Sequence, residues 1–144
     1  MGERIHFLDE DIFTVPNVFR ESECRRLIEK AEQIGFSEAS VRTQSGQQMM
    51  KRLRNNDRVN LVDNELAQEM WARVESQLPT FNVRDAVGID GRLRFYRYSS
   101  GQRFRRHKDG SVTNDAGQQG ILSYLIYLND DFEGGATIFR TTRM

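Results

Sequence analysis

Cysteine, proline and histidine are all scarce in this chain of 144 residues. Its one cysteine, Cys24, excludes an intramolecular disulfide framework and a zinc site built from several thiolates. Because no such framework supports the fold, we expect the chain to reside in the reducing cytoplasm. The two histidines, His6 and His107, severely limit any metal site that depends on imidazole ligands.

Long apolar runs and a net charge are also missing. No stretch approaches the roughly 18 residues that span a bilayer, and the first residues lack the apolar region of a secretion signal. The 21 Lys and Arg residues balance 21 Asp and Glu residues, so no overall field draws the chain toward nucleic acid or an anionic membrane. The length fits a single domain over residues 1–144, and nine Phe, four Tyr and one Trp supply core material for a soluble fold.

The charge is nevertheless unevenly distributed along the chain. Residues 92–108 hold seven basic side chains and no acidic one, and residues 42–58 form a second basic stretch. Arginines in the first stretch either face an acidic substrate or solvate a rim of the fold. The basic residues of this stretch are Arg92, Arg94, Arg97, Arg103, Arg105, Arg106 and Lys108.

Apolar residues at helical spacing predict two helices in the first half of the chain. The first begins at a Ser22 cap and ends at Gly35, and the second covers residues 63–78 and stops at Pro79. The polar segment 41–60 between them is typical of an irregular strand or a loop. The first apolar stripe comprises Cys24, Leu27, Ile28, Ala31 and Ile34, and the second comprises Leu66, Ala67, Met70, Trp71, Val74 and Leu78; Asp63 or Asn64 can cap the second helix.

The second half of the chain has the pattern of β-strands. Residues 92–98 are rich in aromatic side chains and are bounded by Gly91 and by Ser99-Ser100-Gly101, and residues 102–108 follow as a further strand before a turn at Asp109-Gly110. Residues 121–128 carry apolar side chains at both odd and even positions, so both faces of a strand there would be apolar. This pattern predicts a strand buried on both faces. A last short strand is expected at 136–139. Helices followed by strands indicate an α+β fold in which helices buttress a sheet or barrel.

One tripeptide, His107-Lys108-Asp109, has the character of a metal-ligand pair. Side chains two positions apart in extended backbone point to the same side, so the imidazole and the carboxylate can converge on one ion. Two histidines and one carboxylate, with open positions left over, form the facial triad of non-heme Fe(II) oxygenases. The alternative for this tripeptide is a solvated turn.

Three spaced blocks of the sequence carry a family resemblance. The first, RFYRYSSGQRFRRHKD at residues 94–109, has the order Y-x-x-G-x-x-y-x-x-H-x-D. The second joins LSYLIYLND at 122–130 to FEGGAT at 132–137, and the third is Ser22-Glu23-Cys24 at the start of an amphipathic helix. From residue 15 to residue 139 the chain resembles the prolyl 4-hydroxylase family of Fe(II)- and 2-oxoglutarate-dependent dioxygenases.

The resemblance implies a double-stranded β-helix (jelly-roll) core buttressed by N-terminal helices. It implies Fe(II) and 2-oxoglutarate as cofactor and co-substrate, with ascorbate as an accompanying reductant. His107 and Asp109 match the first two iron ligands of the family, and Tyr98 and Tyr127 match positions whose hydroxyls reach toward 2-oxoglutarate. For both tyrosines the alternative is ordinary core packing. Gly134-Gly135 matches a turn and is expected to be conformational, and no residue is assigned a catalytic role of its own.

The chain departs from the family pattern near its C-terminus. No histidine follows His107, and Arg140 and Arg143 come too early to pair with the distal carboxylate of 2-oxoglutarate. Within the chain, His6 alone is left to complete a triad, from a segment that the family places outside the barrel. We therefore expect a jelly-roll that is incomplete at the C-terminus: part of a longer enzyme, a truncated product that pairs its sheet edges with a second copy, or a relative without catalysis.

The sequence thus predicts a dioxygenase that hydroxylates a protein, peptide or small-molecule substrate. Two alternatives remain from the residues themselves. A catalytically impaired jelly-roll binding module is suggested by the absent second histidine. A nucleic-acid oxygenase is suggested by the two basic stretches, although the overall neutrality of the chain argues against a nucleic-acid partner.

Overall fold

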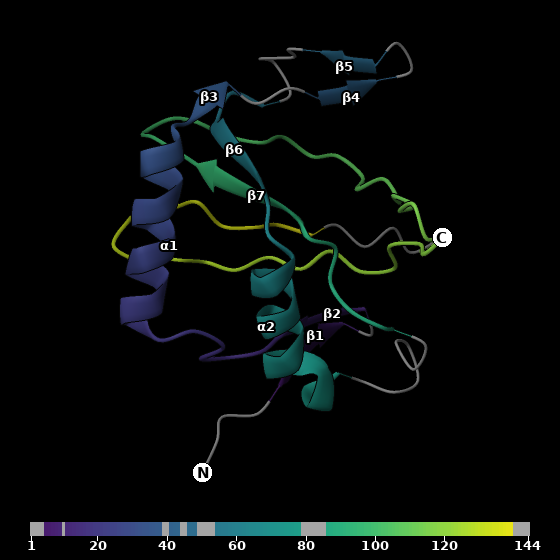
Figure 1. Ribbon diagram of the computed structural model, residues 1–144. Coiled ribbons are helices and arrows are strands. Elements are labelled where there is room, and N and C mark those ends of the chain that lie inside the picture. The colour runs from purple at the N-terminus through teal and green to yellow at the C-terminus, as the bar shows by residue number, and fades with distance from the viewer. Residues whose placement is uncertain are drawn as a thin grey trace.

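The computed structural model describes residues 5–9, 11–38, 41–43, 46–48, 54–78 and 86–139 (Figure 1). Two short hairpins flank a three-stranded antiparallel sheet with the order β3-β6-β7, and two helices pack beside that sheet. The elements are β1 (His6–Asp9), β2 (Ile12–Thr14), α1 (Glu21–Ile34), β3 (Ser37–Glu38), β4 (Val41–Thr43), β5 (Gly46–Gln48), β6 (Asp57–Val62), α2 (Asn64–Val74), the 3₁₀ helix η1 (Glu75–Gln77) and β7 (Arg92–Arg97).

Helix α1 confirms the first predicted helix, with a different start. Its N-cap is Arg20 and not Ser22, because the Glu23 carboxylate accepts a hydrogen bond from the Arg20 backbone N–H at 2.9 Å and closes the first turn. The helix ends as predicted at Gly35, whose φ of 97° is a conformation that side chains with a Cβ rarely adopt. Cys24 and Ala31 are the buried members of its apolar stripe.

Helix α2 confirms the second predicted helix and its cap. The Asp63 carboxylate accepts a hydrogen bond from the Leu66 backbone N–H at 3.0 Å, which satisfies one free donor of the first turn. The α-helix ends earlier than predicted, at Val74, and continues as the 3₁₀ turn η1. In the described parts of the chain, neither helix combines the length and the apolar character needed to cross a membrane.

Strands β6 and β7 form the centre of the fold. β7 confirms the strand predicted at 92–98, whereas β6 lies in the segment where sequence patterns left an irregular strand or a loop. The two strands pair from Asp57 opposite Arg97 to Val62 opposite Arg92. Burial alternates along β7, where residues 93, 95 and 97 are half-buried and residues 92, 94 and 96 are exposed. One face of the sheet is therefore more deeply buried in the fold than the other.

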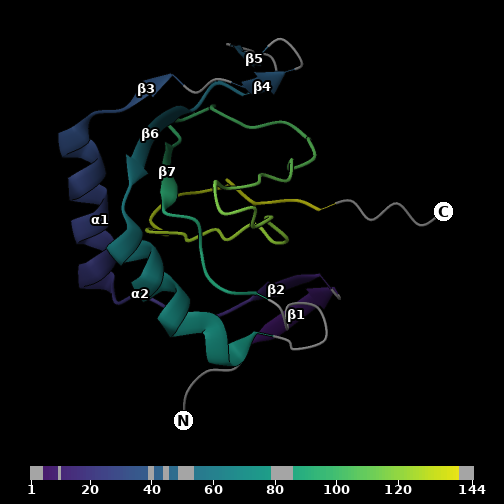
Figure 2. The ribbon, with the colours of Figure 1, turned by 45° about the vertical axis from the view of Figure 1, so that its right-hand side comes forward.

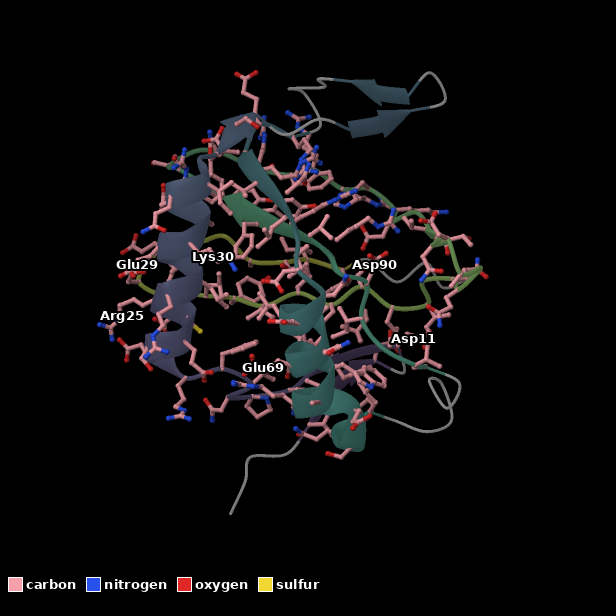
Figure 3. All side chains as sticks on the ribbon, viewed as in Figure 1. Asp11, Arg25, Glu29, Lys30, Glu69 and Asp90 are labelled. Atoms are coloured by element: carbon pink, nitrogen blue, oxygen red, sulfur yellow. The ribbon has the colours of Figure 1, made fainter. Side chains whose placement is uncertain are left out.

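The helices and the sheet make a curved wall, and residues 99–139 lie on its concave side (Figure 2). We call α1, α2, β6 and β7 the wall, and residues 99–139 the site segment. Ionic contacts tie the wall together: Arg73 of α2 contacts Glu23 of α1 at 2.6 Å, and Arg97 of β7 contacts Glu32 of α1 at 2.9 Å. In Figure 3, Arg25 and Glu29 project from the outer side of α1. The wall also holds all the buried apolar residues of the described chain: Cys24, Ala31, Val59, Ala67, Met70 and Val74.

The site segment corrects several strand predictions. Residues 102–108, 121–128 and 136–139 are not strands, because a strand needs a ladder of hydrogen bonds and the described site segment makes only two isolated bridges, Arg54–Phe104 and Thr113–Gln119. The turn predicted at 109–110 lies instead at 114–117. Residues 121–128 are not buried on both faces, since the side chain of Leu125 is 61% exposed.

Other features of the site segment follow the sequence. Gly134 and Gly135 have φ values of 75° and 69°, so the turn there requires the conformational freedom that was expected. The described sheets do not close on one another, and the jelly-roll remains a prediction.

Candidate metal-binding site

The site segment is attached to the wall just before β6. The Asn55 backbone N–H donates to the Arg103 carbonyl at 3.1 Å, and the Arg103 backbone N–H donates to the Asn55 side-chain oxygen at 2.7 Å. The bridge between Arg54 and Phe104 extends this pairing by one residue. These links fix the backbone that leads directly to His107.

A stack of flat side chains continues from this attachment to the imidazole. The Arg54 guanidinium lies 4.7 Å from the ring centre of Tyr96 and 4.0 Å from that of Phe104. The Phe104 ring in turn stacks on the His107 ring, with centroids 3.6 Å apart and planes 6° from parallel. Stacking on a rigid neighbour restricts the rotation of the imidazole, so the wall sets the plane of His107 through Phe104.

His107 and Asp109 converge, as their spacing predicts. The distance between His107 Nε2 and Asp109 Oδ1 is 3.1 Å. Both side chains remain accessible, with 33% and 63% of their surface exposed. The pair is therefore open to an ion or small ligand from solvent.

The tautomer of His107 is fixed by its other nitrogen. Nδ1 lies 2.8 Å from the carbonyl oxygen of Arg105, which can only accept, so Nδ1 carries the hydrogen. In the neutral imidazole Nε2 then carries no hydrogen, and its lone pair faces the Asp109 carboxylate. Two acceptors at this distance repel unless a cation lies between them, either a proton on Nε2 or a metal ion. A backbone carbonyl that accepts from the second ring nitrogen is the usual support of a metal-bound histidine.

Asp109 is oriented from a second direction. The Ser123 hydroxyl donates to Asp109 Oδ2 at 2.8 Å, which leaves Oδ1 directed at the imidazole. The motif patterns did not single out Ser123, because it lies within the apolar run 121–128. A polar residue in the middle of that run was the one available signal.

The two predicted co-substrate tyrosines are placed near each other. Partial burial raises the pKa of Tyr98, and the charge of Arg54 and the hydroxyl of Tyr127 both act on it from nearby. The Tyr127 hydroxyl is hydrogen-bonded to the Thr137 hydroxyl. Within the described residues, no hydrogen bond joins either tyrosine to His107 or Asp109. Their roles toward 2-oxoglutarate remain predictions.

Arginines of the basic stretch divide between the two sides of the sheet. Arg97, one of the candidates for an acidic substrate, instead pairs with Asp57 at 3.1 Å and with Glu32, on the wall side. Arg92 pairs with Asp90 at 2.6 Å. Their strand neighbour Arg94 lies on the exposed face. Alternation along the strand explains the division, which composition alone does not reveal.

Among the residues that the structure describes, no third metal ligand lies beside the pair. His6 belongs to strand β1, opposite Thr14, and the described parts of the chain contain no cluster of three His, Cys, Asp or Glu side chains that can hold a metal. The pair itself fits a divalent ion, since two ligand atoms at right angles and about 2.1 Å from an ion are about 3 Å apart. The donor set suits a first-row metal such as Fe(II), held on two sides by the protein.

Comparisons with known proteins give one distant similarity. The chain is 28% identical over 130 residues to a protein of Arabidopsis thaliana described as probable prolyl 4-hydroxylase 8. The alignment covers 88% of this chain and 44% of that protein, so the chain spans less than half the length of the curated relative it matches. No family model and no solved structure matches the chain. The similarity supports a distant relationship to prolyl 4-hydroxylases.

Proposed function

We propose that this chain contributes the metal-binding segment of an Fe(II)- and 2-oxoglutarate-dependent dioxygenase of the prolyl 4-hydroxylase type. The observation that carries the proposal is the 3.1 Å approach of His107 Nε2 to Asp109 Oδ1, with Nδ1 committed to a backbone carbonyl. The distant similarity to a prolyl 4-hydroxylase supports it independently. The proposed fold is a jelly-roll in which β6 and β7 belong to one of the two sheets.

The residues of this chain would divide the work by position. His107 and Asp109 would hold the metal, while Phe104 and Ser123 keep the imidazole and the carboxylate aimed at each other. Tyr98 and Tyr127 would offer hydroxyl donors to 2-oxoglutarate. When bound, Fe(II) together with 2-oxoglutarate supplies the oxidising power for hydroxylation, and the protein supplies orientation.

The substrate remains open within the proposal. A protein, a peptide or a small molecule carries the hydroxylated carbon, and ascorbate would keep the metal reduced. The paired state of Arg97 and Arg92 removes two cations from the surface available to nucleic acid, which favours the other substrate classes.

A second candidate function is a binding module without oxygenase chemistry. It is favoured by one observation: the described residues bring two and not three metal ligands together. Two protein ligands hold a divalent ion less firmly than three, and ion loss leaves only a ligand-binding surface.

Metal binding by the chain separates the two candidates. Co(II), used as a spectroscopic substitute for Fe(II), is titrated into the chain under calorimetry and visible absorption. We expect a one-to-one complex, and we expect His107→Ala and Asp109→Ala each to weaken it by at least about tenfold. Asp115→Ala, which removes an exposed carboxylate of the same segment, is the matched control and should leave the affinity unchanged.

Turnover is the second stage of the same test. Release of succinate from 2-oxoglutarate under Fe(II) and O₂ is measured with the wild-type chain and with His107→Ala. Succinate release that depends on His107 supports the dioxygenase. Metal binding that is indifferent to both His107 and Asp109 contradicts the proposal.

A further inference from the structure

The last described residues of the site segment form an edge that no other described part of the chain covers. Every residue from 129 to 139 is exposed, at odd and at even positions alike. Ile138 and Phe139, two large apolar side chains in succession, are 82% and 55% exposed. Exposed apolar surface that is continuous, rather than scattered, is typical of an interaction site. We call residues 136–139 the apolar edge.

The apolar edge has a neighbouring segment on one side. The run 132–139 lies beside the run 121–128 in both views of the ribbon (Figures 1 and 2), and the Tyr127 hydroxyl is hydrogen-bonded to the Thr137 hydroxyl. On its other side, no strand and no backbone hydrogen bond of the described residues reaches the apolar edge. Backbone donors and acceptors there remain available to a further strand.

The sequence of the edge contains nothing that opposes such pairing. Residues 134–139, GGATIF, have no charged residue and no proline, which are the residues that commonly protect an exposed edge from association. Thr137, Ile138 and Phe139 are of the types that favour extended backbone. The edge is therefore suited to accept a strand.

The charges on the two sides of the edge have opposite signs. Asp130, Asp131 and Glu133 precede it, and Arg140 and Arg143 follow it in the sequence. Within the described residues, none of the three acids belongs to an ion pair. When two identical segments lie antiparallel, the acidic start of each copy meets the basic end of the other. The charge pattern is therefore complementary to itself and favours a second copy as the partner.

The exposed apolar surface is large enough for a weak dimer. Leu125, Phe132, Ile138 and Phe139 are 49–82% exposed, and together they offer on the order of 500 Å² of apolar surface. With the backbone of the edge, two copies would bury about 1,200 Å², which is the lower limit of a standard protein interface. The chain carries no net charge, so two copies do not repel each other as a whole.

We propose that two copies of this chain associate as an antiparallel dimer with two-fold symmetry through the apolar edge, with the acidic and basic flanks paired between copies. Two-fold association is closed, so each contact is made twice and assembly stops at two copies. The inference goes beyond the proposed function, because the surface does not include His107 or Asp109 and the association needs no metal.

Sedimentation velocity of the chain, in EDTA and from about 1 to 300 μM, tests the dimer. An interface of this size predicts a reversible monomer–dimer equilibrium with a dissociation constant in the micromolar range. Ile138→Lys places a charge on the edge and should weaken the dimer by about tenfold or more. Leu8→Lys, at a position in β1 that is 61% exposed, is the matched control and should associate like the wild type.

Exchange of charges identifies the partner and its orientation. Glu133→Arg and Arg140→Glu should each weaken the dimer by about tenfold, because the two-fold axis turns two attractions into two repulsions. The double variant restores opposite signs and should dimerise within about threefold of the wild type. An equimolar mixture of the two single variants should also dimerise, since one copy is then basic at both flanks and the other acidic. Far-UV circular dichroism confirms that each variant retains its helices.

Three results would overturn the proposal. The first is a wild-type chain that stays monomeric over the whole range, and the second is a dimer that Ile138→Lys leaves intact. The third is a failure of the double variant and of the mixture to associate, which excludes the antiparallel pairing. None of these measurements involves metal, so such a failure leaves the Co(II) and succinate tests of the proposed function unaffected. A dimer that binds no Co(II) would refute the proposed function alone.

Discussion

The wall and the site segment are stabilised in different ways. The wall combines two capped helices with a six-residue strand pairing, and it contains every buried apolar residue of the described chain. The site segment makes two isolated bridges and exposes apolar side chains such as Ile121 and Leu125, which are 59% and 61% exposed. Apolar burial therefore stabilises the first region, whereas the second depends on polar contacts with backbone and side chains.

The difference places the candidate chemistry on the less stable region. His107 and Asp109 belong to the site segment, but their orientation comes from attachment to the wall through Phe104 and Arg54. Regions with few buried contacts open locally without global unfolding. We therefore expect changes in the wall to alter global stability, and changes in the site segment to alter ligand binding with little effect on unfolding.

The largest contrast is expected from an acidic residue introduced into each region. Val59 on β6 is 3% exposed, so Val59→Asp buries a carboxylate and should reduce the free energy of unfolding by about 3 kcal/mol or more. Leu125→Asp, at an exposed position, should change it by less than about 0.5 kcal/mol. Urea unfolding followed by the fluorescence of Trp71, which lies on α2, measures both.

Equal destabilisation by the two variants would show that the wall and the site segment unfold as one unit. A matched volume control, Val59→Ala, separates the charge from the cavity and should cost less than Val59→Asp.

Glycines in left-handed backbone give the second contrast. Gly35→Ala at the end of α1 forces an alanine to φ 97° and should destabilise the wall by about 1–2 kcal/mol. Gly134→Ala has a similar local strain at φ 75°, but the site segment can relax around it. We expect its effect on the Trp71 unfolding transition to be below about 0.5 kcal/mol. Identical shifts of the two midpoints would break the distinction between the regions.

A change within the site segment should act on binding instead. Ser123→Ala removes the hydrogen bond to Asp109 Oδ2 and should weaken Co(II) binding by about tenfold, with no change in the urea midpoint. Ser111→Ala removes a hydroxyl that donates to the Gly120 carbonyl at 2.9 Å, away from the pair, and serves as the control. If the control weakens Co(II) as much as Ser123→Ala, the effect is a general loosening of the segment.

The wall was largely predictable from the sequence, because its elements carry local signals. Apolar spacing located both helices, and Asp63 and Gly35 marked a start and an end. The segment that contains most of strand β6 was predicted as an irregular strand or a loop, because the charged first residues of DRVNLV obscure its alternation. Its identity as a strand depends on pairing with β7, which is a contact that no local window contains.

The site segment was predicted less well for the same physical reason. The apolar pattern at 121–128 indicates that this segment can pack against other apolar surfaces. A strand also needs a neighbouring strand to pair with, and the described structure pairs none with this segment. The convergence of His107 and Asp109 followed from spacing of two. Arg54 and Ser123 reach the site from distant parts of the chain, so only the structure could connect them with it.

The smallest effect that we expect is an acid-dependent one, confined to the wall. Hydrogen bonds from the Arg73 guanidinium and the Arg20 backbone N–H lower the pKa of Glu23 from its ordinary value of 4.5 to about 2. A carboxylate whose pKa is lower in the folded state stabilises the fold fully above pH 4.5 and loses this contribution as the pH falls toward 2. Glu23 is partly exposed, so solvent screening keeps the effect modest.

Glu23→Gln isolates this contribution from other carboxylates that titrate in the same range, such as Asp63, whose pKa is also lowered by hydrogen bonds. The urea midpoint of the wild type should exceed that of Glu23→Gln at pH 6, and the gap should narrow steadily as the pH falls from 4.5 toward 2, because Glu23 becomes protonated over this range. A gap that stays constant across this range would assign the stabilisation to packing of Glu23 and not to its charge. The contacts of Glu23 join α1 to α2, so the affinity for Co(II) at pH 6 should be the same in the wild type and in Glu23→Gln. If Glu23→Gln loses affinity for Co(II) as well as stability, the wall controls the geometry of the His107–Asp109 pair more closely than their separate contacts indicate.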